Sequence, residues 1–322
     1  MKAIILGAVN TPLNITELPM PEAKEGEKRI RIRYAALNHR DVWISKGQYA
    51  AIVTPVVPGS DGCGTDGEGN EVIINPGLHF GDDPRAQSAG FAIVGMPGQG
   101  TLAEYVTVPA GKVYPKPAHL TMEQAAAIPL AGLTAYRALF VRGGYRPGDR
   151  VLVTGIGGGV ALFAMQFALA CGSEVWVTSS SDEKIARATA MGAKGGANYR
   201  NDDWHKAWAA QKLGFDVVVD GAAGPGFSKL LSLCNPGARV AVYGGTAGKI
   251  DGISPQLLFW KQITVAGSTM GSDQDFDDML ALVNEKRIVP VVSRVFEMEQ
   301  AQEAFDYMGD GRQFGKPVIR IA

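Results

Sequence analysis

Strand-like and turn-rich patterns dominate the first part of the chain. Residues 30–34 read Ile-Arg-Ile-Arg-Tyr, which alternates in polarity as a half-buried strand does. Turn-forming sequences follow, for example Pro-Gly-Ser-Asp-Gly at 58–62 and Thr-Asp-Gly-Glu-Gly-Asn at 65–70. Helical periodicity is hard to find in this region. The pattern therefore predicts a β-rich domain over residues 1–118.

After Pro117 the pattern changes to alternating helices and strands. Thr121 and Gln124 have the spacing of a capping box at the start of a helix. Continuous apolar runs, typical of strands buried on both faces, follow at 150–154, 174–179, 216–220, 239–244 and 263–267. Helical patterns lie between them and are clearest over 160–171 and 182–191. This alternation predicts an α/β fold with a doubly wound parallel sheet, the Rossmann arrangement.

The last part of the chain returns to mixed structure. Amphipathic helices are expected at 275–286 and 298–308, and a closing strand at 316–321. We expect this tail to rejoin the first domain. The predicted layout is one domain from residues 1–118 and 267–322, and a second domain from residues 119–266; the glycine-rich segment and the resemblance described below make them the catalytic (substrate) domain and the dinucleotide-binding domain, respectively.

Length and composition limit the possible classes of protein. The 322 residues are enough for two domains, and 46% hydrophobic with 20% charged residues is ordinary for a globular chain. A net charge of −1 gives no reason to expect a nucleic-acid or membrane partner. Cys63, Cys171 and Cys234 are odd in number and far apart, so no disulfide framework is expected. We expect a soluble, cytoplasmic protein.

A glycine-rich segment, Val-Leu-Val-Thr-Gly-Ile-Gly-Gly-Gly-Val-Ala at 151–161, is the clearest chemical signal. An apolar strand that runs through glycines into a helix is the setting of a dinucleotide fingerprint, because backbone N–H groups can approach a pyrophosphate there. The strict G-x-G-x-x-G spacing is not met, and a glycine turn without a ligand is the alternative. The candidate cofactor-binding residues of this loop are Gly155, Gly157, Gly158, Gly159 and Val160.

The end of the second apolar run indicates which nucleotide binds. An NAD site usually carries an acid there, whereas this chain has Ser180 among hydroxyl residues and Lys184 one turn later. Hydroxyls and a cation can hold a 2′-phosphate that an acid would repel. Asp182 and Glu183 lie where acids commonly begin a helix. NADP(H) is therefore the expected cofactor, although the serines could simply cap the helix.

Four segments together resemble the medium-chain dehydrogenase/reductase superfamily, and within it the zinc-free quinone oxidoreductase branch. They are Asn-His-Arg-Asp-Val-Trp at 38–43, Pro-Gly-Ser-Asp-Gly-Cys-Gly at 58–64, residues 126–135 and the glycine-rich segment. The resemblance covers essentially all 322 residues. It implies that the β-rich catalytic domain is GroES-like and accompanies a Rossmann cofactor domain.

The resemblance also bears on metal binding. Zinc-dependent members hold catalytic zinc with cysteine, histidine and acid side chains, and the corresponding positions here are Asn38, Ser60 with Asp61, and Leu130. The closely spaced cysteines of a structural zinc lobe are missing, so no metal is expected. A rival site made of His39, Asp61 and Cys63 uses acceptable ligand types without a recognised spacing. Cys63 is also the thiol that we would test for reactivity.

Roles for individual residues follow from the resemblance. Asn38 is expected to contact the nicotinamide as an orienting group, and Asp41 to support its loop; an asparagine that bonds its own backbone is the alternative. Tyr49 is a candidate proton donor, since Trp43 replaces a common tyrosine, although a packed aromatic is the other interpretation. Lys316 is interpreted as a surface lysine. Further cofactor contacts are assigned to Thr134, Ser180, Lys184, Tyr199, Gly244 and Thr246.

The predicted function is an NADPH-dependent reductase that transfers hydride to a quinone or an α,β-unsaturated carbonyl without zinc. Such acceptors need no Lewis acid, because conjugation delocalises the developing charge. The expected partner is a small electrophilic substrate bound between the domains. An enoyl-thioester reductase, a non-catalytic NADPH-binding redox sensor and, last, a zinc alcohol dehydrogenase are the alternatives. The resemblance also implies a homodimer that pairs through residues 243–267.

Overall fold

The computed structural model describes residues 1–322 as two units, each with its own core. Unit 1 consists of Met1–Leu133 with Gly271–Ala322, and unit 2 is Thr134–Met270. The division therefore lies after Leu133 rather than after residue 118 as expected. Helix α2 (Met122–Ala126) packs against strands β3 and β4 of the first unit, which is why these residues belong to it. The second division likewise lies after Met270 rather than after residue 266.

Unit 1 is built on a seven-stranded sheet with the path β16-β17-β3-β4-β5-β9, from which β8 branches by pairing with β3. Its central strand β3 (Glu27–Ala36) is flanked by antiparallel neighbours on both sides. The other elements of unit 1 are β1 Lys2–Ile5, β2 Asn14–Glu17, α1 His39–Ser45, β4 Asp61–Thr65, β5 Glu71–Ile74, β6 Gly77–Leu78, β7 Ala92–Ile93, β8 Tyr105–Pro109, η1 Ala110–Lys112, β9 Val113–Pro115, α9 Asp273–Glu285, β16 Val292–Glu297, η3 Met298–Gln300, α10 Ala301–Gly309 and β17 Lys316–Arg320.

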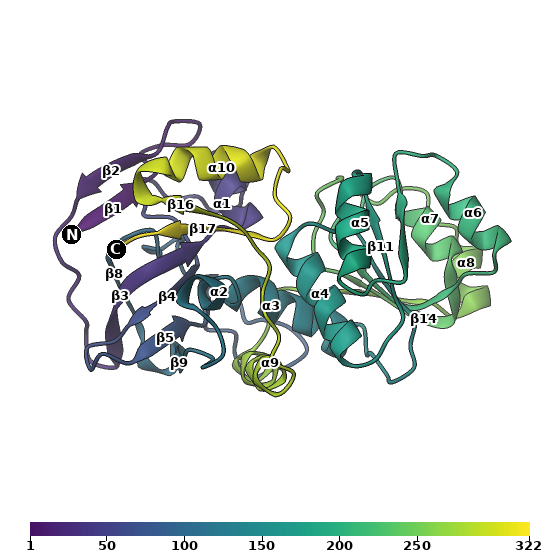
Figure 1. The fold of residues 1–322 in the computed structure, drawn as a ribbon, viewed down its shortest axis with the longest axis horizontal. Coiled ribbons are helices and arrows are strands. Elements are labelled where there is room, and N and C mark those ends of the chain that lie inside the picture. The colour runs from purple at the N-terminus through teal and green to yellow at the C-terminus, as the bar shows by residue number, and fades with distance from the viewer. The chain divides into compact units, whose positions relative to one another are not determined.

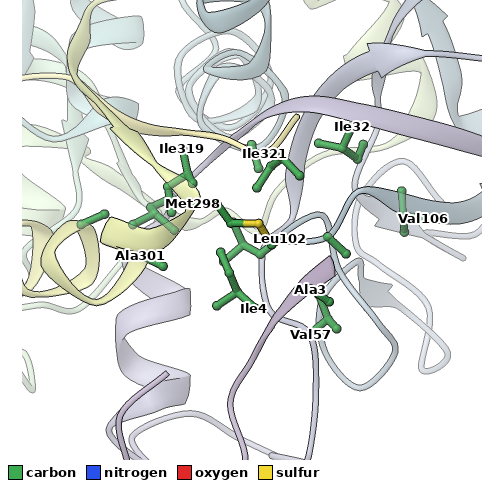
Figure 2. Packing of buried hydrophobic residues seen from close by; sticks show 14 of the residues in the cluster. Ala3, Ile4, Ile32, Val57, Leu102, Val106, Met298, Ala301, Ile319 and Ile321 are labelled. Atoms are coloured by element: carbon green, nitrogen blue, oxygen red, sulfur yellow. The ribbon is translucent and has the colours of Figure 1, made fainter. Parts of the chain in front are cut away.

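The core of unit 1 joins its two chain segments. Side chains from the first strand and from β3 pack with Met298, Ala301 and Ile319 from the last segment (Figure 2). Ile4 and Ile319 are both fully buried, so about 25 cal/mol of stabilisation per Å² of apolar surface is gained across the two segments. The last segment is thus an integral part of this unit.

Unit 2 contains the alternating strands and helices that the apolar runs predict. The capping box at the preceding helix α2 is confirmed, since Thr121 Oγ1 accepts the backbone N–H of Gln124 at 3.4 Å. Helix α3 (Pro129–Tyr136) contains the division between the units. The elements that follow are the π-helical η2 Arg137–Arg142, β10 Val151–Val153, α4 Gly159–Ala170, β11 Val175–Ser179, α5 Asp182–Ala190, β12 Gly195–Asn198, α6 Trp204–Ala210, β13 Phe215–Asp220, α7 Phe227–Ser232, β14 Cys234–Val242, α8 Pro255–Lys261 and β15 Thr264–Gly267.

The six strands of unit 2 are all parallel and follow the order β12-β11-β10-β13-β14-β15. Figure 1 labels β11 and β14 of this sheet, with helices α4 to α8 around it. Strand order reverses beside β10. Helix α4 contacts β10 and β11, α5 contacts β11 and β12, and α8 contacts β14. The predicted Rossmann sheet is confirmed. Strand β12 was not predicted, because its sequence Gly-Gly-Ala-Asn contains no large apolar residue.

One edge of the unit 2 sheet is apolar and exposed. Strand β15 lies at this edge, with Val265 40% exposed, and the preceding α8 presents Phe259 and Trp260 at 58% and 78% exposure. Large side chains this exposed are unusual on a surface that meets only water. No helix of the structure is long and apolar enough to cross a membrane.

Candidate functional site

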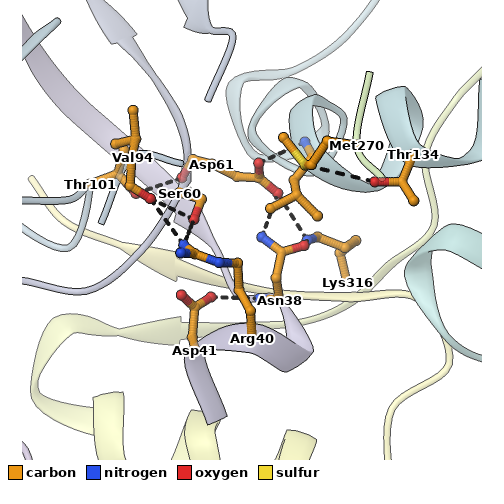
Figure 3. A network of polar contacts seen from close by, with 11 residues as sticks. Asn38, Arg40, Asp41, Ser60, Asp61, Val94, Thr101, Thr134, Met270 and Lys316 are labelled. Atoms are coloured by element: carbon orange, nitrogen blue, oxygen red, sulfur yellow. Dashed lines mark hydrogen bonds and ion pairs between the residues drawn. The ribbon is translucent and has the colours of Figure 1, made fainter. Parts of the chain in front are cut away.

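A buried polar network in unit 1 joins Asn38, Asp61 and Lys316, and we call it the Lys316 network (Figure 3). The Lys316 ammonium donates to Asn38 Oδ1 at 2.5 Å and to Asp61 Oδ2 at 2.9 Å. Asn38 Nδ2 donates to the same carboxylate oxygen at 2.9 Å. Both ends of the Asn38 amide are therefore bonded to buried charged side chains.

Strand register explains why these distant residues meet. Ala36, the last residue of β3, pairs with Val318 of β17 on one side and with Asp61 of β4 on the other. The backbone N–H of Leu37 then donates to Pro317 O at 3.0 Å. Asn38 follows directly, so its side chain lies between the beginnings of β4 and β17.

The charged groups of this network are buried, so each of them needs a partner of opposite charge. Lys316 is 2% exposed and Asp61 fully buried, so the interpretation of Lys316 as a surface lysine is wrong. The other carboxylate oxygen of Asp61 accepts the backbone N–H of Leu130 at 2.8 Å. A buried carboxylate and a buried ammonium each compensate the other, and removal of either one would leave an unpaired charge.

Asp41 and Arg40, from the first turn of α1, surround the network. Asp41 Oδ2 accepts the backbone N–H of Asn38 at 2.8 Å, which fixes the backbone that carries the Asn38 amide. Burial raises the pKa of Asp41, and the neighbouring Arg40 guanidinium partly counters this rise. Arg40 Nη1 donates to Ser60 Oγ at 2.6 Å and to Val94 O at 3.1 Å.

Tyr49 lies apart from the network, although both belong to unit 1. Its ring packs with the apolar cluster of Leu6, Ile44, Val56 and Met96, and the Arg40 guanidinium carbon lies 5.2 Å from the ring centroid. The tyrosine hydroxyl makes no hydrogen bond to Asn38, Asp61 or Lys316. Tyr49 therefore has the environment expected of a packed aromatic side chain, which was the other interpretation of this residue.

The residues at the metal-ligand positions do not fit a zinc ion. Asn38 offers an amide and Leu130 a backbone N–H, and the Asp61 carboxylate already compensates the ammonium of Lys316. Zinc sites in proteins use thiolates, imidazoles and carboxylates as ligands. A backbone N–H has no lone pair to offer and cannot ligate a cation. No group of three or more His, Cys, Asp or Glu side chains in the structure could hold a metal ion.

The rival ligand set does not assemble either. Cys63 is fully buried, and desolvation raises the pKa of its thiol to about 12, so a thiolate is scarce at neutral pH. The His39 ring faces Trp43 at a centroid distance of 6.0 Å. Cys63 is therefore a poor candidate for the reactive thiol. Cys234 is similarly buried, whereas Cys171 is only partly buried.

The glycine loop of unit 2 has the geometry of a phosphate cradle. It leaves β10 and ends at Gly158, the N-cap of the twelve-residue helix α4. Gly155 and Gly157 have φ values of +65° and +116°, which side chains rarely allow. Gly159 and Val160 open the helix, whose first N–H groups have no partner within it. Five candidate residues thus lie at a helix N-terminus suited to an anion.

Lys184 lies over this loop. A Cβ built at Gly157 would come within 2.7 Å of Lys184 Cδ and 3.4 Å of its Nζ. The lysine is held from α5, whose N-cap Ser181 accepts its backbone N–H at 3.3 Å. Partial burial lowers the pKa of Lys184, and Glu183 opposes that shift.

The neighbouring residues at the ends of β11 and β12 have distinct roles. Ser181 caps α5 and Ser179 donates to Ile156 O at 3.3 Å, while Ser180 makes neither contact. The Asp182 carboxylate accepts from Asn198 Nδ2 at 3.0 Å. Tyr199, 47% exposed, follows β12. The serine hydroxyl, the lysine and the tyrosine therefore share the carboxyl edge of the sheet with the glycine loop.

The remaining candidates of unit 2 also lie after strands. Gly244 and Thr246 follow β14, and Thr246 N donates to Gly221 O at 3.4 Å. A Cβ at Gly244 would meet this same Gly221 oxygen at 2.8 Å. Thr134 is buried, and its hydroxyl contacts Met270 Sδ at 3.8 Å.

Asp220 lies at the carboxyl edge of the unit 2 sheet, beside the glycine loop, and the sequence pattern did not single it out. It ends β13, is fully buried, and accepts from Thr154 Oγ1 at 2.5 Å and from Ala223 N at 2.8 Å. Burial raises its pKa. Since Thr154 precedes Gly155, this bond fixes the start of the glycine loop to the neighbouring strand. An acid that ends an apolar run was the available signal.

Comparison with known proteins finds a family model within unit 1 and a second one that covers most of unit 2 and continues through α9 of unit 1. Residues 24–118 match the alcohol dehydrogenase GroES-like domain, and residues 159–285 match the model described as zinc-binding dehydrogenase. The zinc-type alcohol dehydrogenase-like protein YogA of Leptosphaeria maculans is 34% identical over 98% of this chain and 96% of its own.

Solved structures are similar over the whole length. A crystal structure of an NAD-dependent alcohol dehydrogenase is 36% identical, with a TM-score of 0.93 and complete coverage of both chains. The quinone oxidoreductase of Thermus thermophilus, solved also with NADPH, is 31% identical with a TM-score of 0.83 and equal coverage. With its GroES-like unit, its pyridine nucleotide-binding Rossmann unit and these relatives, the chain belongs to the medium-chain dehydrogenase/reductase superfamily of oxidoreductases.

Proposed function

We propose that this protein is an NADPH-dependent reductase that transfers hydride to a quinone or an α,β-unsaturated carbonyl compound without zinc. The observation that carries the proposal is the Lys316 network, which fills the metal-ligand positions with an amide, a backbone N–H and an ion pair. Oxidation of a simple alcohol needs a Lewis acid or a strong base. An electron-poor conjugated acceptor needs only orientation and stabilisation of the developing oxyanion.

The preference for NADPH rests on the carboxyl edge of the unit 2 sheet. A 2′-phosphate carries charge that Lys184 can match, and Ser180 offers a hydroxyl that is not used by the helix cap. The acid nearest in sequence, Asp182, is bonded to Asn198. The bound dihydronicotinamide would supply the hydride. Gly155, Gly157 and the start of α4 would hold its pyrophosphate.

The proposal is tested with purified protein by NADPH oxidation with 1,4-benzoquinone and a simple enone offered in parallel. Activity that survives chelation, in protein found free of zinc by elemental analysis, is the expected result. Ethanol with NAD+ serves as the contrasting assay. Turnover of ethanol that chelation abolishes would refute the proposal in favour of a zinc alcohol dehydrogenase.

Two further outcomes identify the alternatives. Tight NADPH binding with turnover of an enoyl thioester but of neither simple acceptor would indicate an enoyl-thioester reductase. Tight NADPH binding without turnover of any of these acceptors would indicate a binding or sensor role. Both results would contradict the general reductase.

We also propose that the protein forms a homodimer through the exposed edge of unit 2. The edge strand β15 and the adjoining α8 expose Val265, Phe259 and Trp260. Association of two copies would pair the free strand edge and bury these side chains together. The oligomeric state is measured by analytical ultracentrifugation.

A further inference from the structure

The Lys316 ammonium has an unused hydrogen-bond donor. An ammonium carries three N–H groups, and the structure provides acceptors for two of them, Asn38 Oδ1 and Asp61 Oδ2. Asn38 and Asp61 are occupied: both ends of the amide are bonded, and both carboxylate oxygens accept. The one donor left over in this network therefore belongs to its cation.

Structural support alone explains this arrangement poorly. Well-packed apolar residues of similar volume are often as stabilising as a buried ion pair, because desolvation offsets much of the Coulomb attraction. Strand β17 is already held to β3 and β16 by main-chain bonds. A lysine that is 2% exposed and held by two acceptors is instead a fixed positive charge, and fixed charges act most strongly on charge that develops beside them.

Arg40 also has an unused donor, since its buried Nε has no hydrogen-bond partner, but it is not bonded to Asn38 or Asp61. Its Nη1 donates to Ser60 and to the Val94 carbonyl, and its guanidinium lies over the Tyr49 ring. The remaining candidate donor in the sequence, the Tyr49 hydroxyl, lies with an apolar cluster. Lys316 is thus the cation of unit 1 that is joined directly to Asn38, the residue at the first metal-ligand position.

We propose that Lys316 is a catalytic residue whose ammonium takes the place of the metal ion and stabilises the oxyanion formed on the substrate. The inference rests on the proposed reductase function and deepens it. Asn38 and Asp61 act as positioning residues, since they hold the ammonium. The substrate class that fits is a conjugated carbonyl, whose oxygen receives the third N–H.

The reaction balances without any other reagent. Reduction of an enone by NADPH moves a hydride to the β-carbon, breaks the C=C π bond and places the electron pair on the carbonyl oxygen as an enolate. NADPH becomes NADP+, and the ammonium compensates the oxyanion without losing its own proton. A proton from water then adds to the α-carbon and gives the saturated ketone.

The test removes the ion pair as a unit. The double variant Lys316→Met with Asp61→Asn avoids a lone buried carboxylate, so that loss of folding does not obscure the result. The matched control is Lys112→Met with Asp273→Asn, a second buried lysine of unit 1 that pairs with an aspartate. Hydride transfer is followed by single-turnover oxidation of NADPH, and NADPH affinity is measured separately.

We expect the Lys316 double variant to transfer hydride about 100- to 1,000-fold more slowly, the effect of removing one oxyanion donor. Its NADPH affinity should equal that of the wild type, and the control should keep wild-type rates. A series of ring-substituted aryl vinyl ketones adds a readout that a structural role would not move. Electron-withdrawing substituents should accelerate the variant more steeply than the wild type, because the substrate must then stabilise its own charge.

Three outcomes decide the inference. A Lys316 double variant that keeps the wild-type rate overturns it, as does a slow variant with an unchanged substituent slope. Slow hydride transfer with a steeper slope supports it. If the wild type itself reduces neither quinone nor enone, the proposed function fails first, and this inference falls with it.

Discussion

Replacement of Lys184 by methionine should weaken NADPH binding and leave NADH binding unchanged. Methionine keeps the unbranched stem that lies over Gly157, so the packing of the glycine loop is retained while the charge is lost. NADH lacks the 2′-phosphate, and the pair of cofactors therefore provides an internal comparison within one protein.

The magnitude follows from the surroundings of the lysine. A hydrogen bond to a charged group contributes about 1.5–3 kcal/mol. Lys184 is partly buried rather than enclosed, so solvent and salt screen the contact and the lower part of that range applies, about 1.5–2 kcal/mol. This corresponds to roughly a 10- to 30-fold increase in the NADPH dissociation constant. The increase should be larger at low ionic strength.

Titration of NADPH and NADH by fluorescence, at two salt concentrations, measures the effect. Lys194→Met is the matched control, because Lys194 is exposed and its backbone N–H bonds Val175 at the opposite end of β11. Equal weakening of both cofactors, or no change in NADPH affinity, would refute the assignment of the 2′-phosphate to Lys184.

Three other perturbations have defined outcomes. Gly157→Ala should lower the free energy of unfolding by about 1–3 kcal/mol and weaken NADPH binding, because the φ of +116° suits glycine and the new Cβ would press on Lys184. Denaturant titration with and without NADPH measures both effects, and unchanged values would contradict the loop geometry. Cys63 and Cys234, each with a pKa raised to about 12 by burial, should resist alkylation of the native protein at neutral pH, and rapid labelling of either by intact mass would disprove their assigned burial. Trp260→Glu should convert the expected dimer to monomer in sedimentation, and a persistent dimer would place the interface elsewhere.

Residue patterns were sufficient to predict the sheet and the glycine loop that leads into α4. Long apolar runs are the direct signature of strands buried on both faces, so β10, β11, β13, β14 and β15 were predicted near their observed positions. Strand β12 was missed because Gly195–Asn198 enters the sheet through main-chain pairing with β11, to which its side chains contribute no pattern. The predicted domain boundary ignored α2, since its packing on β3 and β4 is tertiary.

The candidate site was predictable only in its parts. Asn38 and Asp61 were identified through the resemblance, but nothing local marks Lys316, which stands between a glycine and a proline. Its partners lie 255 and 278 residues away, and only the register of β17 on β3 brings them together. The surroundings of Tyr49 and Cys63 were equally hidden from the sequence. Residue type suggested chemistry, whereas burial in an apolar environment governs what each group can do.

The division of unit 1 between both ends of the chain sets the order in which a nascent protein can acquire this network. Translation proceeds at about 5–20 residues per second, so the 255 residues between Asp61 and Lys316 take roughly 13–50 s to synthesise. Throughout this interval Asp61 has no lysine to compensate it, and β3 lacks its partner β17. Unit 2 is a continuous segment and can complete its sheet on the ribosome first. Synthesis of the last strand therefore both closes the GroES-like sheet and delivers the cation, so a chain that stops short of β17 lacks the Lys316 network altogether.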